Sequence, residues 1–448
     1  MKRFLLCLPF LALLGSLSAG EGDPFLAAGD AAGRGDYLTL KLAVLGPGDE
    51  LYLWWGHMGL IIEDALSGQD RFYDWGVFSF DRENFFYNFA FGRLVYSCAA
   101  GPAEANISRI IRENRDITLY TLDLPPEVKT GVMLFAENNV LPENRDYFYH
   151  HFKDNCATRI RDIIDTATGG AFRARYGEAP GRFTLREHVR RHTWFSPPWD
   201  WALNFWMGQD IDKPITVWDE MFLPSEIAGR IKDFTYTGSR GEERKLVSRV
   251  ETLNRAVNRP GVLSAPPAGW GGELAAGLGI AAFFLLCRVM ESRKQKTPGK
   301  AKGKNARSPW RVLLGTGQAA LGLFFGALGF ILFFMSLFTN HDYTYHNSSL
   351  LFVNPLLFIA APQGLLYAFT GNEEKRRRSA RLLKLLWTYV FCGGLLTMAI
   401  KFLPLFCQQN QPVQALILPF ALALSFAPDL AGKGLRRKGL CGLCGFTL

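Results

Sequence analysis

The feature that most constrains this fold is a sharp change of composition at Gly271, where a mixed polar sequence gives way to long apolar runs. Five apolar spans follow, at 271–290, 312–338, 351–370, 385–407 and 413–431. Each approaches or exceeds the roughly 20 residues that a helix needs to cross a bilayer. The sequence therefore predicts an all-α membrane domain of five transmembrane helices over residues 271–431.

The connections between these spans alternate in charge. Lysine and arginine crowd residues 288–311, the stretch "EEKRRRSARLLK" and the stretch "GKGLRRKG", whereas "TNHDYTYHNSS" and "QQNQPV" contain neither. The positive-inside rule puts the basic connections in the cytoplasm and the other two outside. These basic segments carry a surplus of 16 positive charges although the whole chain is only +9. The basic composition therefore reflects topology and contact with anionic lipids, and it indicates no nucleic-acid partner.

The N-terminus carries a second targeting signal. Lys2 and Arg3 precede the apolar run "FLLCLPFLALLG" and the small residues "SLSAG", which is the pattern of a secretory signal peptide over residues 1–19. An uncleaved anchor helix is the alternative. Both signals predict a multi-pass protein of the inner (cytoplasmic) membrane with residues 34–269 as a periplasmic domain. Residues 432–448 then form a cytoplasmic tail.

The stretch "KDNCATRIRDIID" places Cys156 at the start of an expected helix. Asp154 is a suitable N-cap, the apolar residues have helical spacing, and Gly169–Gly170 is a plausible end. A thiol in the first turn lies against the positive end of the helix dipole, which favours the thiolate. Three interpretations remain open: a nucleophile, a disulfide with Cys98, or a small buried residue.

A cysteine nucleophile needs a base, and His57 is one candidate. It lies in "LWWGHMGLIIED", which has strand composition, and "RFYDWGVF" can return as the second arm of a hairpin. A packed core histidine is the alternative. His150 and His151 lie closer to Cys156 in sequence. No HExxH motif, pair of CxxC motifs or glycine-rich phosphate loop occurs in this domain, so we expect neither a metal nor another cofactor.

These residues also carry a resemblance to a known family. The blocks "GHMGLIIED", "FYDWGVFSFDRENFFYNFAFGRLVYSC" and "LPENRDYFYHHFKDNCATRIRDIID" are similar to the Lnb family, described as lipoprotein N-acyltransferases, and "TNHDYTYHNSSLLFVNPL" resembles that family's first outer loop. The domain is also similar to the circularly permuted branch of the papain-like superfamily, which includes NlpC/P60 relatives. The resemblance implies an α+β papain-like (circularly permuted NlpC/P60-like) exported domain followed by the all-α membrane domain.

The resemblance implies that Cys156 is the nucleophile and His57 the general base. For the third group, which orients the imidazole, we predict Asp74, because the hairpin can carry it to His57. Asp64 and a backbone carbonyl are competitors, since a slip of one residue in register would turn Asp74 to the other face. Asn155 either polarises a substrate carbonyl or caps the helix. Arg159 and Asp162 match the family block, and we interpret them as an ion pair on the helix.

The implied reaction moves a fatty acyl chain from a membrane phospholipid, through a Cys156 thioester, to the terminal amine of a diacylglyceryl lipoprotein. His341 and Asn347, in the outer loop, match the family block and are expected to bind substrate; a solvated turn is the alternative. Two other functions remain possible. One is a cell-wall (peptidoglycan) amidase or peptidase, and the other is a non-enzymatic membrane assembly protein.

Overall fold

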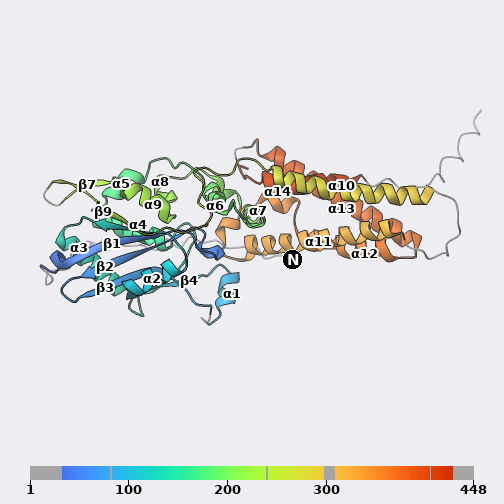
Figure 1. The fold of residues 1–448 in the computed structure, drawn as a ribbon. Coiled ribbons are helices and arrows are strands. Elements are labelled where there is room, and N and C mark those ends of the chain that lie inside the picture. Colours follow the sequence, from blue (N-terminus) through green and yellow to red (C-terminus); the bar gives the residue numbers. More distant parts are fainter. Residues whose placement is uncertain (1–32, 81–82, 239–240, 297–307, 404, 427–448) are drawn as a thin grey trace, which may run out of the picture.

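The computed structural model describes residues 33–80, 83–238, 241–296, 308–403 and 405–426 (Figure 1). The expected signal peptide and cytoplasmic tail, and the end of the fifth expected span, lie outside these residues. The described chain forms an elongated molecule with an antiparallel sheet at one end and a bundle of long helices at the other (Figure 1). We refer to these two parts as the N-terminal domain and the helical domain.

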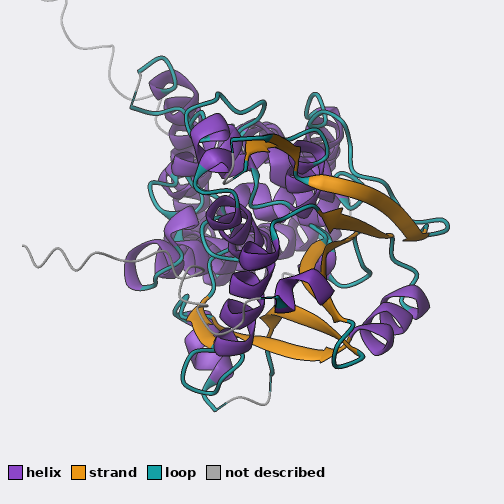
Figure 2. Ribbon diagram, turned by 90° about the vertical axis from the view of Figure 1, so that its left-hand side faces the viewer, coloured by secondary structure: helices purple, strands orange, loops and turns teal. Residues whose placement is uncertain are grey.

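A seven-stranded antiparallel sheet organises the N-terminal domain, in the order β6-β4-β3-β2-β1-β5-β9. Its strands are β1 (Leu38–Leu45), β2 (His57–Asp64), β3 (Gln69–Val77), β4 (Val95–Pro102), β5 (Ile117–Leu122), β6 (Asp146–Phe148) and β9 (Val247–Asn254). A separate hairpin pairs β7 (Thr235–Thr237) with β8 (Glu243–Lys245). Seen from this end of the molecule, the strands lie among helices that cover the sheet (Figure 2).

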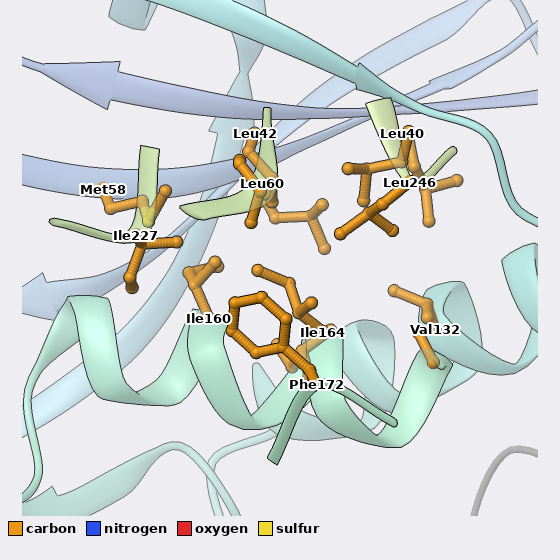
Figure 3. Close-up of a cluster of buried hydrophobic side chains, with 14 of the residues drawn as sticks. Leu40, Leu42, Met58, Leu60, Val132, Ile160, Ile164, Phe172, Ile227 and Leu246 are labelled. Carbon is orange, nitrogen blue, oxygen red and sulfur yellow. The ribbon is translucent and has the colours of Figure 1, made fainter. Parts of the chain in front are cut away.

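Nine helices belong to this domain: α1 (Phe85–Ala90), α2 (Ala103–Arg112), α3 (Pro126–Asn139), α4 (Cys156–Ala167), α5 (Ala171–Tyr176), α6 (Leu185–Thr193), α7 (Pro197–Trp206), α8 (Val217–Glu220) and α9 (Pro224–Ile231), among the residues that the structure describes. Helix α4 packs against the sheet because Ile160 and Ile164 share one helix face and meet Leu42 and Leu60 of β1 and β2 (Figure 3). Burial of these side chains fixes α4, and therefore its first residue, relative to β2.

The predicted hairpin is confirmed as β2 and β3. Its register pairs Leu60 with Tyr73 and Asp64 with Gln69. Beyond Asp74 the pairing of β3 with β4 shifts, so that two residues of β3 face one residue of β4 before Val77 pairs again. Such a bulge increases the local twist and re-aims neighbouring side chains. It lies in β3 beside the end of β2 that begins with His57.

The helical domain contains α10 (Gly271–Lys296), α11 (Pro309–Phe338), α12 (Ala360–Phe369), α13 (Glu373–Ile400) and α14 (Gln411–Ser425). Among the described residues, four segments are long and apolar enough to span a membrane: Gly271–Arg293, Pro309–Phe338, Ser348–Phe369 and Glu373–Ile400. The fifth expected span corresponds to α14, which has only 15 described residues. The described residues therefore support four spans by length and composition, and the fifth expected span stays a prediction.

Two expected spans differ from the structure in detail. The span expected at 351–370 is an α-helix only from Ala360, because two short 3-10 helices, Ser348–Leu351 and Pro355–Ile359, precede it. Asn354 caps the second of these, and the proline after it suits a helix start. The span expected at 385–407 begins earlier: the basic stretch "EEKRRRSARLLK" forms the first turns of α13 instead of a loop.

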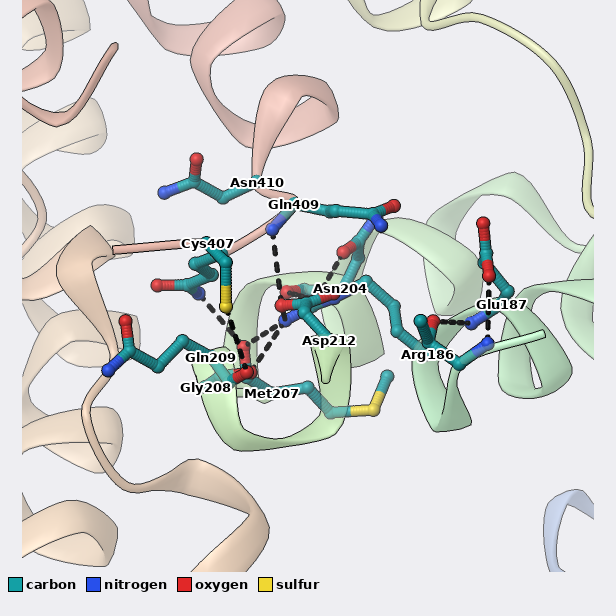
Figure 4. Close-up of polar contacts among 12 residues, drawn as sticks. Arg186, Glu187, Asn204, Met207, Gly208, Gln209, Asp212, Cys407, Gln409 and Asn410 are labelled. Atoms are coloured by element: carbon teal, nitrogen blue, oxygen red, sulfur yellow. Dashed lines mark hydrogen bonds and ion pairs between the residues drawn. The ribbon is translucent and has the colours of Figure 1, made fainter. Parts of the chain in front are cut away.

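A buried polar cluster joins the two domains; we call it the junction cluster (Figure 4). Arg186 of α6 is fully buried and forms an ion pair with the equally buried Asp212. Its guanidinium also donates hydrogen bonds to backbone carbonyls after α7, including that of Met207 at 2.8 Å. From the helical domain, Gln408 donates to the same carbonyl at 2.9 Å, and Asn347 donates to Phe205 O at 2.8 Å.

Candidate active site

Helix α4 begins at Cys156, as the sequence predicts, but its N-cap is Asn155 and not Asp154. The Asn155 carboxamide oxygen accepts hydrogen bonds from the amides of Ala157 and Thr158, at 2.9 and 3.0 Å. The Thr158 hydroxyl in turn accepts a hydrogen bond from the backbone amide of Asn155 at 2.7 Å. This reciprocal capping box explains why the helix starts at Cys156. The amide of Cys156 has no intrahelical acceptor, since it belongs to the first turn.

The Asn155 side chain is fully used by this cap and its surroundings. Its amide nitrogen donates to the carbonyls of His151 and Phe222, at 2.8 and 3.0 Å, while its oxygen accepts the two helix amides. An asparagine side chain has two donor hydrogens, and both are already engaged. Of the two interpretations drawn from the sequence, the geometry favours the cap over contact with a substrate.

His57 is the first residue of β2 and follows Gly56, which has a φ of +77°. A Cβ at Gly56 would lie 2.7 Å from the carbonyl oxygen of Leu45, so the chain passes β1 too closely for any other residue. Leu45 is also the residue that pairs with His57 across the sheet. The close turn before β2 therefore holds the backbone of His57 in one place.

Asp74 is brought to His57 by the hairpin. Its Oδ1 lies 2.8 Å from His57 Nε2 and also accepts the amide of Gly76 at 2.7 Å. A Cβ at Gly76 would lie 2.4 Å from His57 Cε1, so the absence of a side chain there makes room for the ring. Because Asp74 engages Nε2, the imidazole keeps Nδ1 for the Cys156 thiol, with which His57 also interacts.

The charges of this group reinforce one another. Burial alone would lower the pKa of His57, but Asp74 and Cys156, through charge and hydrogen bonding, raise it to about 10. Burial would raise the pKa of Asp74, but the charge and hydrogen bonds of His57 and the Gly76 amide lower it below its ordinary value. His57 therefore holds a proton, and a positive charge beside Cys156, at neutral pH.

The structure separates Asp64 from this group. It ends β2, seven residues along the strand from His57, where it bonds Arg34 at 2.8 Å and accepts the amide of Leu66. The expected ion pair between Arg159 and Asp162 is wrong. Arg159 instead binds Asp154, at 2.6 and 2.8 Å, and Asp162 pairs with Arg161. Arg159 thus reaches back to a carboxylate that precedes the helix, and Asp162 pairs with its neighbour in the chain.

Cys98 and Cys156 are both free cysteines. Cys98 lies 1 % exposed in the core of the domain, where burial raises the pKa of its thiol to about 12. Cys156 instead borders a cavity. The two thiols that the sequence could not distinguish therefore occupy different environments, one inert and one open to a ligand.

The cavity beside Cys156 has a volume of about 750 Å³ and also contacts His57 and Asp74. Aromatic side chains make up much of its wall: Tyr52, Trp55, Phe78, Phe80, Phe85, Phe89, Tyr96, Tyr149, Phe152, Phe222 and Tyr343. The last of these comes from the outer loop of the helical domain. The volume and the apolar wall suit a ligand with hydrocarbon chains, and both domains build the site.

The two outer-loop residues expected to bind substrate lie differently. His341 is 6 % exposed and packs behind the cavity wall, with its ring stacked on Tyr343 at 5.5 Å between centroids. Asn347 is absent from the lining and belongs to the junction cluster, where it also accepts Gln408 Nε2 at 2.9 Å. His346 is exposed and bonds Asp210. Neither His341 nor Asn347 is brought to Cys156.

Sequence reasoning missed two residues of the site, Tyr343 and Gly76, and it noted His151 only as one of two histidines close to Cys156 in the chain. Tyr343 contributes to the wall from the opposite domain, which no local pattern indicates. His151 borders the cavity, and burial and the neighbouring histidines lower its pKa to about 4, so it is neutral near pH 7. Gly76 could have been found, because a glycine opposite a strand histidine signals close approach. No cluster of three or more possible metal ligands occurs in the described parts of the chain.

Comparison with known proteins gives one finding. Residues 28–191 match the family model of the Lnb N-terminal periplasmic domain. Searches of curated proteins and of solved structures gave no match. The match covers His57, Asp74 and Cys156, and it supports the resemblance to the Lnb family that the sequence indicates. A periplasmic domain family together with several membrane-length helices supports a multi-pass membrane protein.

Proposed function

We propose that this protein is a cysteine-dependent lipoprotein N-acyltransferase of the inner membrane, with a papain-like catalytic domain on the periplasmic side. It would transfer a fatty acyl chain from a phospholipid to the N-terminal amine of a diacylglyceryl-cysteine lipoprotein. One observation carries the proposal: a thiol at a helix start, an imidazole and a carboxylate meet in an aromatic cavity at the junction with the membrane helices. The Lnb family match supports it.

In the first half-reaction, the Cys156 sulfur attacks the carbonyl carbon of a phospholipid ester. The helix cap occupies the amides of Ala157 and Thr158, so the Cys156 amide is the donor left at the helix start for the oxyanion. The ester C–O bond then breaks, and His57 gives its proton to the departing glycerol oxygen. The products are a thioester on Cys156 and a lysophospholipid.

In the second half-reaction, the terminal amine of the lipoprotein attacks the thioester carbonyl. His57 accepts the proton that the amine loses, and the C–S bond breaks to leave an amide and the Cys156 thiolate beside a protonated imidazole. Asp74 stabilises that imidazolium and holds Nε2, so that Nδ1 remains directed to the sulfur. An ester and an amine become an alcohol and an amide, which requires no nucleotide and no metal.

The aromatic wall favours this reaction over hydrolysis of peptidoglycan. A peptidoglycan substrate is a hydrophilic glycopeptide, whereas the side chains around Cys156 offer mostly apolar surface. The contribution of Tyr343 from the helical domain also gives that domain a part in building the site. A soluble cell-wall amidase would need no such contribution.

The decisive experiment is mass spectrometry of the N-terminal peptide of a model lipoprotein, from cells that rely on this protein for that modification. We expect an amide-linked acyl chain with the wild-type protein and with Cys98→Ala, and none with Cys156→Ala. Cys98 is the matched control because it is the other cysteine described in the N-terminal domain. An unmodified peptide from the well-expressed wild type would overturn the proposal and favour the cell-wall amidase.

A further inference from the structure

One end of the cavity differs from the rest because its side chains are charged. Arg109, Glu113 and Arg115 line it, on or just after α2. Arg115 lies two residues before Ile117, and Ile117 and His57 both pair with Leu45, from β5 and β2 respectively. The charged end therefore lies at the same edge of the sheet as His57.

Arg115 is 3 % exposed, and its guanidinium is incompletely paired. Its Nε donates to the carbonyl of Gly46 at 3.0 Å, and its Nη1 lies 3.7 Å from Glu113 Oε2, which is an ion pair without a hydrogen bond. Its Nη2 is buried and has no hydrogen-bond partner in the described part of the chain. A buried charged donor left unpaired is costly, so this nitrogen is suited to receive an anionic oxygen.

Glu113, which carries the opposite charge, also has a buried atom without a hydrogen-bond partner. Its Oε1 accepts a hydrogen bond from Arg109 Nη1 at 2.9 Å. Its Oε2 is buried and lacks a hydrogen-bond partner among the residues described. A carboxylate oxygen of this kind is suited to receive an ammonium group. The wall at this end of the cavity thus contains one buried donor and one buried acceptor, on neighbouring side chains, that lack hydrogen-bond partners among the described residues.

We propose that this end is a head-group subsite for phosphoethanolamine, so that phosphatidylethanolamine is the preferred acyl donor; the inference rests on the proposed function. Arg115 donates to a phosphate oxygen, and the ethanolamine ammonium donates to Glu113. A glycerol head group has no cation for Glu113, and a choline head group has no N–H to donate. Arg109 is half exposed and can move aside at little cost to admit the ligand.

Aromatic side chains connect this subsite to the nucleophile. Tyr52 packs edge-on against Phe78, with 5.4 Å between centroids, and Phe78 packs against Tyr96 at 5.0 Å. All three line the same cavity as Cys156. A phospholipid can therefore place its head group at the charged end, its ester near the thiol, and its acyl chains against the aromatic wall.

The test uses the purified full chain with vesicles of phosphatidylethanolamine, phosphatidylglycerol or phosphatidylcholine that carry identical acyl chains. Intact mass spectrometry follows the thioester on Cys156. We expect the ethanolamine lipid to react about tenfold faster than the others, and Glu113→Gln to remove most of that preference. Glu104→Gln, an exposed glutamate of the same helix, is the matched control and should keep the preference. Equal rates with all three lipids would overturn the subsite.

A binding measurement separates this inference from the proposed function. Cys156→Ala protein, which cannot form a thioester, is examined by native mass spectrometry for retained phosphatidylethanolamine, with and without Glu113→Gln. Selective retention that Glu113→Gln abolishes supports the subsite even if no lipid acylates the wild type, which would count against the acyltransferase alone. Non-selective retention overturns the subsite. Displacement by soluble phosphoethanolamine would show that the head group suffices, and persistence of the lipid that its chains are also required.

Arg115 is tested separately, because its bond to Gly46 also has a structural role. We expect Arg115→Lys to keep the fold and the positive charge but to lose the guanidinium, whose Nη2 is the proposed donor to phosphate. Thioester formation from phosphatidylethanolamine should then slow several-fold. Arg112→Lys, at the exposed last residue of α2 and three residues before Arg115, serves as the matched control. An unchanged rate in a folded Arg115→Lys protein would overturn the phosphate contact.

Discussion

Two polar clusters in this molecule contain similar residue types but differ in whether their hydrogen-bonding groups are used up within the protein or face a cavity. Around Cys156, the His57 ring uses one nitrogen on Asp74 and directs the rest of its capacity to the thiol and the cavity. In the junction cluster, Arg186 meets Asp212 at 2.7 Å through Nε and reaches carbonyls with its other nitrogens. Asn347 and Gln408 complete the cluster from the helical domain.

This difference gives a criterion for distinguishing residues that act on a ligand from residues that only hold the two domains together. Arg186, Asn347 and Gln408 hold the two domains together and use all of their donors within the protein, because unused capacity in a buried place costs free energy. Groups that act on a ligand retain capacity that faces a space. By this criterion Asn155 and Asn347 are structural, although both are polar and lie near the proposed chemistry in sequence or in topology.

The largest effect that would break this comparison is expected at His57. His57→Ala removes the acid and base of both half-reactions, and we expect thioester formation to fall by about a thousandfold or more. The free energy of unfolding should fall by less than for Arg186→Ala, since the side chains of His57 and Asp74 remain 16 % and 19 % exposed and water can reach the carboxylate left behind. Single-turnover mass spectrometry measures the first quantity, and guanidinium titration followed by tryptophan fluorescence measures the second. Loss of activity through unfolding would contradict the comparison.

The opposite pattern is expected in the junction cluster. Arg186→Ala leaves Asp212 as a buried, unpaired carboxylate, and we expect a loss of about 3–5 kcal/mol in the free energy of unfolding. Arg190→Ala on the same helix is the control. Its contacts with Asp200 are longer, at 3.3 and 3.4 Å, so its loss should be clearly smaller. A folded, stable Arg186→Ala protein would show that the cluster does not fasten the domains.

The sequence predicted what depends on local pattern. The Cys156 helix and the hairpin that brings Asp74 to His57 follow from helical spacing, a capping residue and strand composition. The saturating partners of Asn155 and Asn347 could not be predicted, because Phe222 and Phe205 lie 67 and 142 residues away in the chain. Hydropathy likewise measures composition and not backbone form. It therefore missed the 3-10 segments before Ala360, although an asparagine followed by a proline marks that start.

A moderate effect is expected at Gly76, where the backbone itself makes room for His57. Gly76→Ala places a Cβ about 2.4 Å from His57 Cε1, so the ring must shift. A displaced base costs activity more than stability, and we expect thioester formation to slow about 10- to 100-fold. Gly101→Ala in β4 is the control, since its Cβ would meet Asn106 at an ordinary 3.4 Å. Equal rates in the two variants would show that the ring position is not limiting.

The pH dependence of thioester formation tests whether the proton on His57 is the one used in the reaction. Because the pKa of His57 is raised to about 10, its proton is present throughout the neutral range and is lost as pH rises through that value. We expect thioester formation to decline only above about pH 10. Asp74→Asn removes the charge that holds the proton and should move this decline to lower pH by a unit or more. An unmoved decline would mean that another group donates the proton to the glycerol oxygen.

The smallest effect is expected at Asp342, where the loop before α4 contacts the loop of the helical domain. His150 and Lys153, on the loop that leads into α4, both bond Asp342 of the outer loop, the first at 2.8 Å. Burial would raise the pKa of Asp342, but these bonds lower it well below its ordinary value. The contact therefore contributes fully to stability above the ordinary carboxyl pKa of about 4, and this contribution is lost as pH falls from there through the lowered pKa of the folded protein.

Asp342→Asn should then reduce the free energy of unfolding by about 0.5–1 kcal/mol at pH 7, a modest value because the carboxylate is 36 % exposed and screened by solvent. The difference from wild type should shrink as pH is lowered from 5 to 3, because Asp342 takes up a proton there in the unfolded chain while it stays charged in the folded protein. If thioester formation at pH 7 also falls, the outer loop positions the loop that carries the nucleophile. If only stability falls, the contact is purely structural. Asp342, whose carboxylate is engaged by His150 and Lys153, then has the same kind of role as Arg186 and not that of His57.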